Sequence, residues 1–112
     1  MVTVENLRAY GANVEEGLTR CLNNESFYLM LVGKGLEDAN FDRLREAMAD
    51  GNSPAAFEAA HALKGSIGNL ALTPIYEPIS RLTELLRGQS GPVDGAALVD
   101  EIMRQREKAL RL

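Results

Sequence analysis

The segment from Ser53 to Leu70 constrains the fold of this chain more strongly than any other. Its apolar residues recur at spacings of three, three, four and three: Phe57, Ala60, Leu63, Ile67 and Leu70. That spacing is typical of a helix with one buried face. Ser53 and Pro54 stand at its beginning, and a capping hydroxyl followed by proline indicates a helix start. We therefore expect a helix from Ser53 to about Leu70 that is buried along this stripe.

The rest of the chain also follows the helical period. Apolar spacing, polar caps and terminal glycines predict further helices over about 3–10, 13–22, 25–35, 40–49, 73–87 and 94–112. The expected N-caps are Thr3, Asn13, Asn40, Thr73 and Asp94. The segment 25–35 is apolar around most of its circumference, so we expect it to be the most buried helix. No alternation of apolar and polar residues lasts long enough to predict a strand.

Short connections between these helices determine the expected architecture. Links of about two to eight residues favour antiparallel neighbours. We expect an all-α fold, namely an antiparallel up-and-down four-helix bundle with additional short helices at its N-terminal end. A length of 112 residues is enough to bury a core and corresponds to one domain over 1–112.

Composition and charge exclude several classes of partner. The net charge of −4 argues against nucleic acid, because neutralising phosphates needs a basic face. The longest apolar stretch, Phe27 to Val32, is far shorter than the roughly 20 residues of a membrane span. No secretory signal is visible, and the single cysteine, Cys21, cannot form an internal disulfide. We therefore expect a cytoplasmic protein with no nucleic-acid and no membrane partner.

The only histidine, His61, lies on the side of the 53–70 helix that faces away from the core stripe. At 100° per residue, Gly65 and Gly68 lie within about 40° of His61, Lys64 at about 60° and Asn69 at about 80°. Each glycine costs a helix interior roughly 0.5–1 kcal/mol relative to alanine. Glycines beside the imidazole suggest a surface kept flat for another protein, which Gly65, Gly68 and Asn69 would contact.

The residue types on this face favour phosphoryl chemistry over the alternatives. A neutral imidazole can accept a phosphoryl group, and the Lys64 ammonium can stabilise the resulting dianion. Ser66 lies about 140° around the helix from His61, too far for a catalytic triad. One histidine and one cysteine, far apart in the sequence, do not make a metal site, and no glycine-rich phosphate loop is present. We expect no metal and no cofactor; a surface histidine without a role is the structural alternative.

The hexamer His61-Ala62-Leu63-Lys64-Gly65-Ser66 resembles the His-x-Leu-Lys-Gly-Ser/Ala core of histidine-containing phosphotransfer (HPt) domains of bacterial two-component phosphorelays. Gly17-Leu18-Thr19-Arg20, and then Tyr28 and Leu31, are similar to upstream elements of that family. Further similarities occur at Ala47, Gly51, Ala55-Ala56, Ala59-Ala60, Leu70 and Leu72, so the resemblance covers roughly residues 10–88.

This resemblance implies a four-helix bundle in which His61 carries a phosphoryl group from one receiver-domain aspartate to another. It also implies that Lys64 stabilises the phosphoryl group and that Gly65 makes room for the receiver. The implied partners are response-regulator receiver domains and a hybrid histidine kinase. HPt domains have no kinase activity of their own, so we expect no enzyme, and the Mg²⁺ of the reaction belongs to the receiver.

The resemblance also implies a polar group on the next helix that orients the imidazole. If the helices over 54–70 and 74–87 pair in antiparallel fashion, Thr83 or Glu84 comes level with His61 and Arg87 lies about one turn away. Thr83 would hold the position at which family members often have glutamine, and Ala71 replaces a glycine common in the family. The alternative functions are a non-catalytic HPt-like adaptor that binds receiver or kinase domains and a purely structural bundle.

Overall fold

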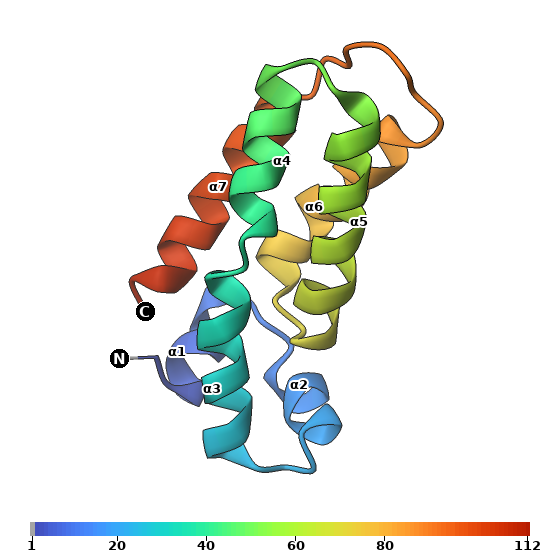
Figure 1. The fold of residues 1–112 in the computed structure, drawn as a ribbon. Coiled ribbons are helices and arrows are strands. Elements are labelled where there is room, and N and C mark those ends of the chain that lie inside the picture. The colour runs from blue at the N-terminus through green and yellow to red at the C-terminus, as the bar shows by residue number, and fades with distance from the viewer. Residues whose placement is uncertain (1) are drawn as a thin grey trace.

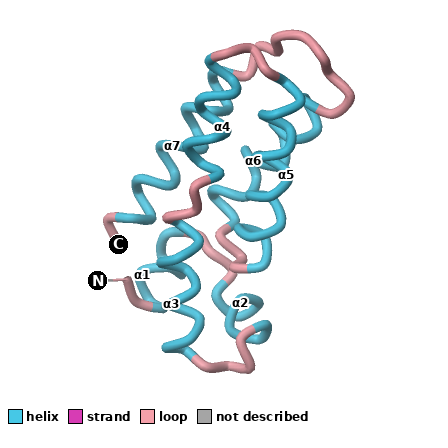
Figure 2. The backbone as a smooth tube through the Cα atoms, in the orientation of Figure 1, coloured by secondary structure: helices cyan, strands magenta, loops and turns pink. Residues whose placement is uncertain are grey.

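The structure, a computed structural model, describes residues 2–112 as an assembly of helices (Figure 1). The helices in this range are α1 (Val4–Tyr10), α2 (Val14–Arg20), α3 (Glu25–Leu36), α4 (Asn40–Ala49), α5 (Ser53–Asn69), α6 (Thr73–Leu86) and α7 (Ala96–Leu110). Only turns and loops connect them, and the described residues contain no strand (Figure 2). The prediction of an all-α fold is confirmed, and each predicted helix is present.

The last four helices, α4 to α7, form the bundle. α5 packs between α4 and α6, α6 also packs on α7, and α7 returns to contact α4. The short helices α1 and α2, together with α3, lie at one end of an elongated molecule measuring 43 × 23 × 19 Å (Figure 1). No helix within residues 2–112 combines the length and the apolar character needed to cross a membrane.

The core runs through the bundle and into its N-terminal end. Its largest fully buried side chains come from all elements except α2: Leu7, Tyr28, Phe41, Leu44, Leu63, Ile67, Leu72, Ile75, Ile79, Leu82, Leu86 and Ile102. Burying a side chain of this kind contributes about 1.5–3 kcal/mol each. The face of α5 that carries Leu63 and Ile67 is therefore fixed toward the interior, and its opposite face is fixed toward the surface.

Two of the predicted N-caps are correct, and those of the bundle helices are not. Thr3 and Asn13 accept the backbone N–H groups of Asn6 and Glu16 as expected. At α5 the cap is Asn52, which accepts the Ala55 N–H, because the Ser53 hydroxyl is buried and donates to the Gly91 carbonyl.

The other three differ for similar local reasons. Asn40 is the first residue of α4, and its N–H donates to the Asp38 carboxylate at 2.8 Å. Thr73 is the first residue of α6, whose N-cap is Leu72. Asp94 precedes Gly95, the N-cap of α7, and provides no side-chain cap. Each N-cap of the four bundle helices therefore lies one residue from the predicted position.

The expectation that α3 is the most buried helix is wrong. Tyr28, Val32 and Leu36 are buried, but Phe27 and Met30 are 44% and 46% exposed. α3 lies at one end of the molecule, where it packs on α2 and α7 (Figure 1). Its apolar circumference is thus larger than the surface that the fold offers to cover it.

Candidate functional site

His61 projects from the middle of α5 into solvent, on the side opposite Leu63 and Ile67. The ring of Phe57, one turn earlier, stacks on the imidazole with a centroid distance of 5.6 Å and an interplanar angle of 21°. Phe57 was expected in the core stripe. It lies instead at the edge of that stripe, because at 100° per residue a side chain four positions before His61 falls on the same side of the helix. The imidazole is therefore held against a partly buried aromatic ring.

A chain of charged contacts runs from α6 to this face. The Lys64 ammonium lies 3.7 Å from the Glu84 carboxylate, and the Arg87 guanidinium donates to both oxygens of the same carboxylate at 3.0 and 3.1 Å. Arg87 also lies over the Phe57 ring, 5.2 Å from its centroid. The hydrogen bonds from Arg87 lower the pKa of the Glu84 carboxyl below its ordinary value, and the charge of Lys64 adds to that effect. Glu84 is therefore a carboxylate at neutral pH.

Of the two residues expected to come level with His61, Thr83 is buried in the core and Glu84 is exposed. The Thr83 side chain is fully buried, and its hydroxyl donates to the Ile79 carbonyl one turn earlier in α6. The adjacent position, Glu84, points outward and contacts Lys64. Neighbouring side chains in a helix point about 100° apart. Because Thr83 is directed into the core, Glu84 is the one of the two that lies on the outside beside Lys64.

The two glycines of the face have different surroundings. A Cβ atom on Gly65 would meet nothing within 4 Å, so the surface beside His61 is open there. A Cβ atom on Gly68 would lie 2.9 Å from Cε1 of Tyr76, which belongs to α6. The absence of a side chain at Gly68 thus allows α5 and α6 to pack closely, whereas nothing in the described chain requires a glycine at position 65.

An open groove of about 640 Å³ lies beside His61. Its lining combines the predicted residues Lys64, Gly65, Gly68 and Asn69 with residues of α2 and α6 that the sequence did not indicate as site residues: Glu16, Arg20, Thr73, Tyr76 and Glu77. Only the fold brings these segments together. The one sequence feature that pointed toward α2 was the motif ending in Arg20.

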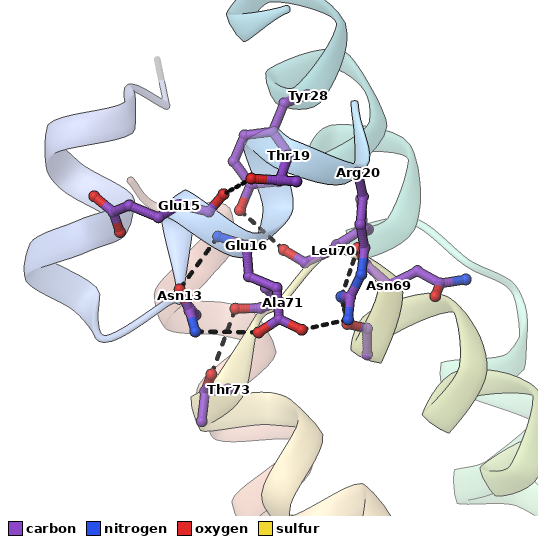
Figure 3. A network of polar contacts seen from close by, with 11 residues as sticks. Asn13, Glu15, Glu16, Thr19, Arg20, Tyr28, Asn69, Leu70, Ala71 and Thr73 are labelled. Atoms are coloured by element: carbon purple, nitrogen blue, oxygen red, sulfur yellow. Dashed lines mark hydrogen bonds and ion pairs between the residues drawn. The ribbon is translucent and has the colours of Figure 1, made fainter. Parts of the chain in front are cut away.

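Arg20 anchors α2 to the end of α5 next to the groove (Figure 3). Its guanidinium donates to the carbonyls of Gly68 at 2.8 Å and Asn69 at 3.3 Å. The Tyr28 hydroxyl donates to the Leu70 carbonyl at 2.9 Å (Figure 3). A helix C-terminus leaves its last carbonyls without intrahelical partners. Arg20 and Tyr28 supply donors to two of them, at Asn69 and Leu70, so the N-terminal helices are hydrogen-bonded to the end of the histidine-bearing helix.

The described residues 2–112 contain no group of three or more His, Cys, Asp or Glu side chains placed to hold a metal ion. The site combines the exposed imidazole with an open helix surface at Gly65 and with charged side chains of both signs around the groove and along α6.

Comparison with models of known protein families identifies the family of this chain. The family model described as Hpt domain matches residues 37–111. The chain belongs to the Hpt domain family. Hpt domains are histidine carriers of phosphorelays, and they interact with receiver domains of two-component systems. No curated protein and no solved structure matches the chain.

The Hpt match contains all of α4 to α7 and hence the whole bundle with His61. Helices α1 to α3 precede the matched range, although Gly17, Arg20 and Tyr28 resemble upstream elements of Hpt sequences. In this Hpt domain a Cβ atom on Gly17 would lie 2.4 Å from the Tyr28 ring, so Gly17 allows that ring to reach the end of α5.

Proposed function

We propose that His61 accepts a phosphoryl group from the aspartate of a receiver domain and passes it to the aspartate of another receiver. The observation that carries this proposal is the position of the only histidine. It is exposed in the middle of α5, inside the range that matches the Hpt family, and beside the open surface at Gly65. A receiver of a hybrid histidine kinase is a suitable donor, and a response regulator is a suitable acceptor.

The transfer exchanges one bond to phosphorus for another. A ring nitrogen of neutral His61 attacks the phosphorus of the aspartyl phosphate and forms a P–N bond. The P–O bond to the receiver breaks, and its electron pair returns to the carboxylate. The second transfer reverses these steps with a new aspartate. We assign the Mg²⁺ of the reaction to the receiver, which leaves this chain the tasks of presenting the imidazole and holding the phosphoryl group.

Lys64 and the glycine surface support these two tasks. Lys64 lies one residue short of a full turn from His61, where its ammonium can approach a phosphoryl group on the ring. Gly65, Gly68 and Asn69 line the groove beside His61 and form the docking face that we assign to the receiver. An aspartate can reach the imidazole only if the partner backbone comes close, which a bare helix surface at Gly65 allows.

Labelling of His61→Gln tests the proposal. Wild-type protein incubated with phosphorylated receiver domains should acquire a label that is lost in acid and retained in base, as expected for a phosphoramidate. His61→Gln should fold normally and remain unlabelled, while Ser66→Ala, its matched control on the same helix, should be labelled like the wild type. Label on His61→Gln would overturn the assignment, and receiver binding without any label on the wild type would indicate an adaptor.

Lys64→Ala separates the role of the ammonium from that of the imidazole. We expect slower transfer or a shorter phosphohistidine lifetime, with the urea midpoint close to that of the wild type because surface substitutions usually change stability by less than about 0.5 kcal/mol. Lys64→Arg should restore only part of the function, since a guanidinium differs from an ammonium in shape and hydration. If the transfer rate and the phosphohistidine lifetime of Lys64→Ala equal those of the wild type, Lys64 does not stabilise the phosphoryl group.

A further inference from the structure

Glu84 contacts two cations near the His61 face, Lys64 of α5 and Arg87 directly after α6. It lies 3.7 Å from the Lys64 ammonium and accepts two hydrogen bonds from Arg87. Arg87 reaches the same face through Phe57, since its guanidinium lies over the ring that stacks on His61. The Glu84 carboxylate therefore pairs with both positive groups while the imidazole carries no phosphoryl group.

A phosphoryl group on His61 would compete with that carboxylate. It carries a charge of about −1.5 to −2 near neutral pH and three acceptor oxygens, so it attracts ammonium and guanidinium groups more strongly than a single carboxylate does. Glu84 must then release part of its contacts with Lys64 and Arg87, and its own negative charge remains nearby. Both effects disfavour the phosphorylated state.

Resting on the proposed function of His61, we propose that Glu84 is a competing carboxylate that lowers the equilibrium phosphorylation of this domain. It holds Lys64 and Arg87 in the unphosphorylated protein and yields them to the phosphoryl group. Coupling of this kind is reciprocal: Glu84 weakens phosphorylation by the same factor by which phosphorylation weakens the ion pairs of Glu84. Glu84 is thus a positioning residue, acting through the two cations, that makes the domain a more ready donor to the next receiver.

The equilibrium, rather than the rate, isolates this effect. Substitutions on a docking face change how fast a receiver exchanges phosphoryl groups with His61. The final distribution between two free proteins depends only on the stability of each phosphohistidine. A competition experiment in which wild type and variant share one phosphoryl pool therefore reports on Glu84 without a contribution from docking.

The experiment uses the full chain. Wild type labelled with ¹⁵N is mixed with an equal amount of an unlabelled variant, limiting phosphoramidate as a small-molecule donor, and a trace of a receiver domain that exchanges label with wild type. Intact-mass spectra at neutral pH give the phosphorylated fraction of each protein. Glu84→Gln should carry about two- to five-fold more phosphoryl group than wild type, the range expected for exposed ion pairs, and the ratio should approach one at high salt.

Asp42→Asn is the matched control. Asp42 and Arg45 form a pair with the same i, i+3 spacing on α4, and their side chains are 62% and 60% exposed, compared with 56% and 53% for Glu84 and Arg87. The phosphorylated fraction of Asp42→Asn should equal that of wild type, so their ratio should stay at one. A ratio for Glu84→Gln equal to that of Asp42→Asn would overturn the inference while leaving the proposed function intact.

Arg87→Gln tests the route through the cations. It should lower the phosphorylated fraction, and the gain from Glu84→Gln should shrink when Arg87 is already glutamine, because the two residues act as a unit. Equal gains in both backgrounds would contradict a role through Arg87. Failure of wild type to become phosphorylated on His61 would instead overturn the proposed function itself.

Discussion

Gly65 illustrates how a residue can be unnecessary for the fold. Nothing lies within 4 Å of the position that its Cβ atom would take, and the residue is exposed in the interior of α5. A helix interior normally favours alanine over glycine by up to about 1 kcal/mol. The stability of this protein therefore gives no reason for glycine at this position, which supports the docking face that we propose for a receiver.

Gly65→Ala should separate stability from function. We expect a free energy of unfolding up to about 1 kcal/mol higher, from the better helix propensity of alanine, and a modest loss in the rate of phosphotransfer. Gly65→Glu should fold but lose most transfer, since it adds volume and a negative charge beside the phosphoryl group. Urea unfolding and transfer from a phosphorylated receiver measure the two effects. Transfer at the wild-type rate by Gly65→Glu would contradict the docking face.

Gly68→Ala should behave differently, because its neighbour is part of the same protein. The added methyl group would lie 2.9 Å from Tyr76, so the ring must move, and overpacking typically costs about 1–3 kcal/mol. We expect Gly68→Ala to be less stable than Gly65→Ala by about 1–2 kcal/mol in urea unfolding. In a Tyr76→Ala background the difference should disappear. If it persists there, the contact with Tyr76 is not its cause.

At the scale of the element, the end of α5 is the point at which the site depends on backbone geometry. The Leu72 N–H donates to the Ile67 carbonyl and the Ala71 N–H to the Gly68 carbonyl, which together form a Schellman motif. Ala71 is the left-handed residue of this motif, with a φ of 58°. Glycine usually occupies this position, since an L-residue pays about 1–2 kcal/mol for left-handed geometry.

Ala71→Gly should therefore stabilise the protein. The expected gain in the free energy of unfolding is about 0.5–1 kcal/mol, less than the full conformational cost because glycine also gains freedom in the unfolded chain. Chemical denaturation in urea measures it, and Ala62→Gly in the interior of α5 is the control that should lose stability instead. A loss of stability in Ala71→Gly would indicate that the buried methyl group contributes more than the strain costs.

At the scale of the whole molecule, local sequence patterns predicted the helices and their faces, whereas features that depend on long-range contacts were not predicted. The helices and the outward position of His61 follow from spacing, because a stripe such as Leu63 and Ile67 determines both faces of α5. The second helix at the site was harder to predict: Thr83 and Glu84 are neighbours, and only the packing of α6 on α5 determines which one reaches Lys64. The part of Arg20 in the groove depends on a contact 48 residues away along the chain, which no local pattern encodes.

Two tyrosines join the N-terminal helices to the bundle. The Tyr28 hydroxyl of α3 donates to the Leu70 carbonyl at the end of α5, and the Tyr10 hydroxyl of α1 lies 2.9 Å from the Gln105 carbonyl oxygen of α7. Burial raises the pKa of Tyr28 to about 12, with the charges of Cys21 and Glu15 adding to it. The pKa of Tyr10 is raised as well, by burial first and then by the charge of Glu101. Both hydroxyls stay protonated donors wherever the protein is folded near neutral pH.

Alkaline pH should therefore lower the free energy of unfolding through these two tyrosine hydroxyls. The unfolded chain ionises its tyrosines near pH 10, while the folded protein retains their protons. Their contribution to stability is fully present below about pH 10 and is lost as pH rises toward the folded pKa values. Above pH 10, each should lower the free energy of unfolding by about 1.4 kcal/mol per pH unit. Urea midpoints from pH 9 to 11 measure the slope, which Tyr28→Phe and Tyr10→Phe should each reduce by about half. A Tyr28→Phe slope equal to that of the wild type would show that this hydroxyl is not what couples alkaline pH to unfolding.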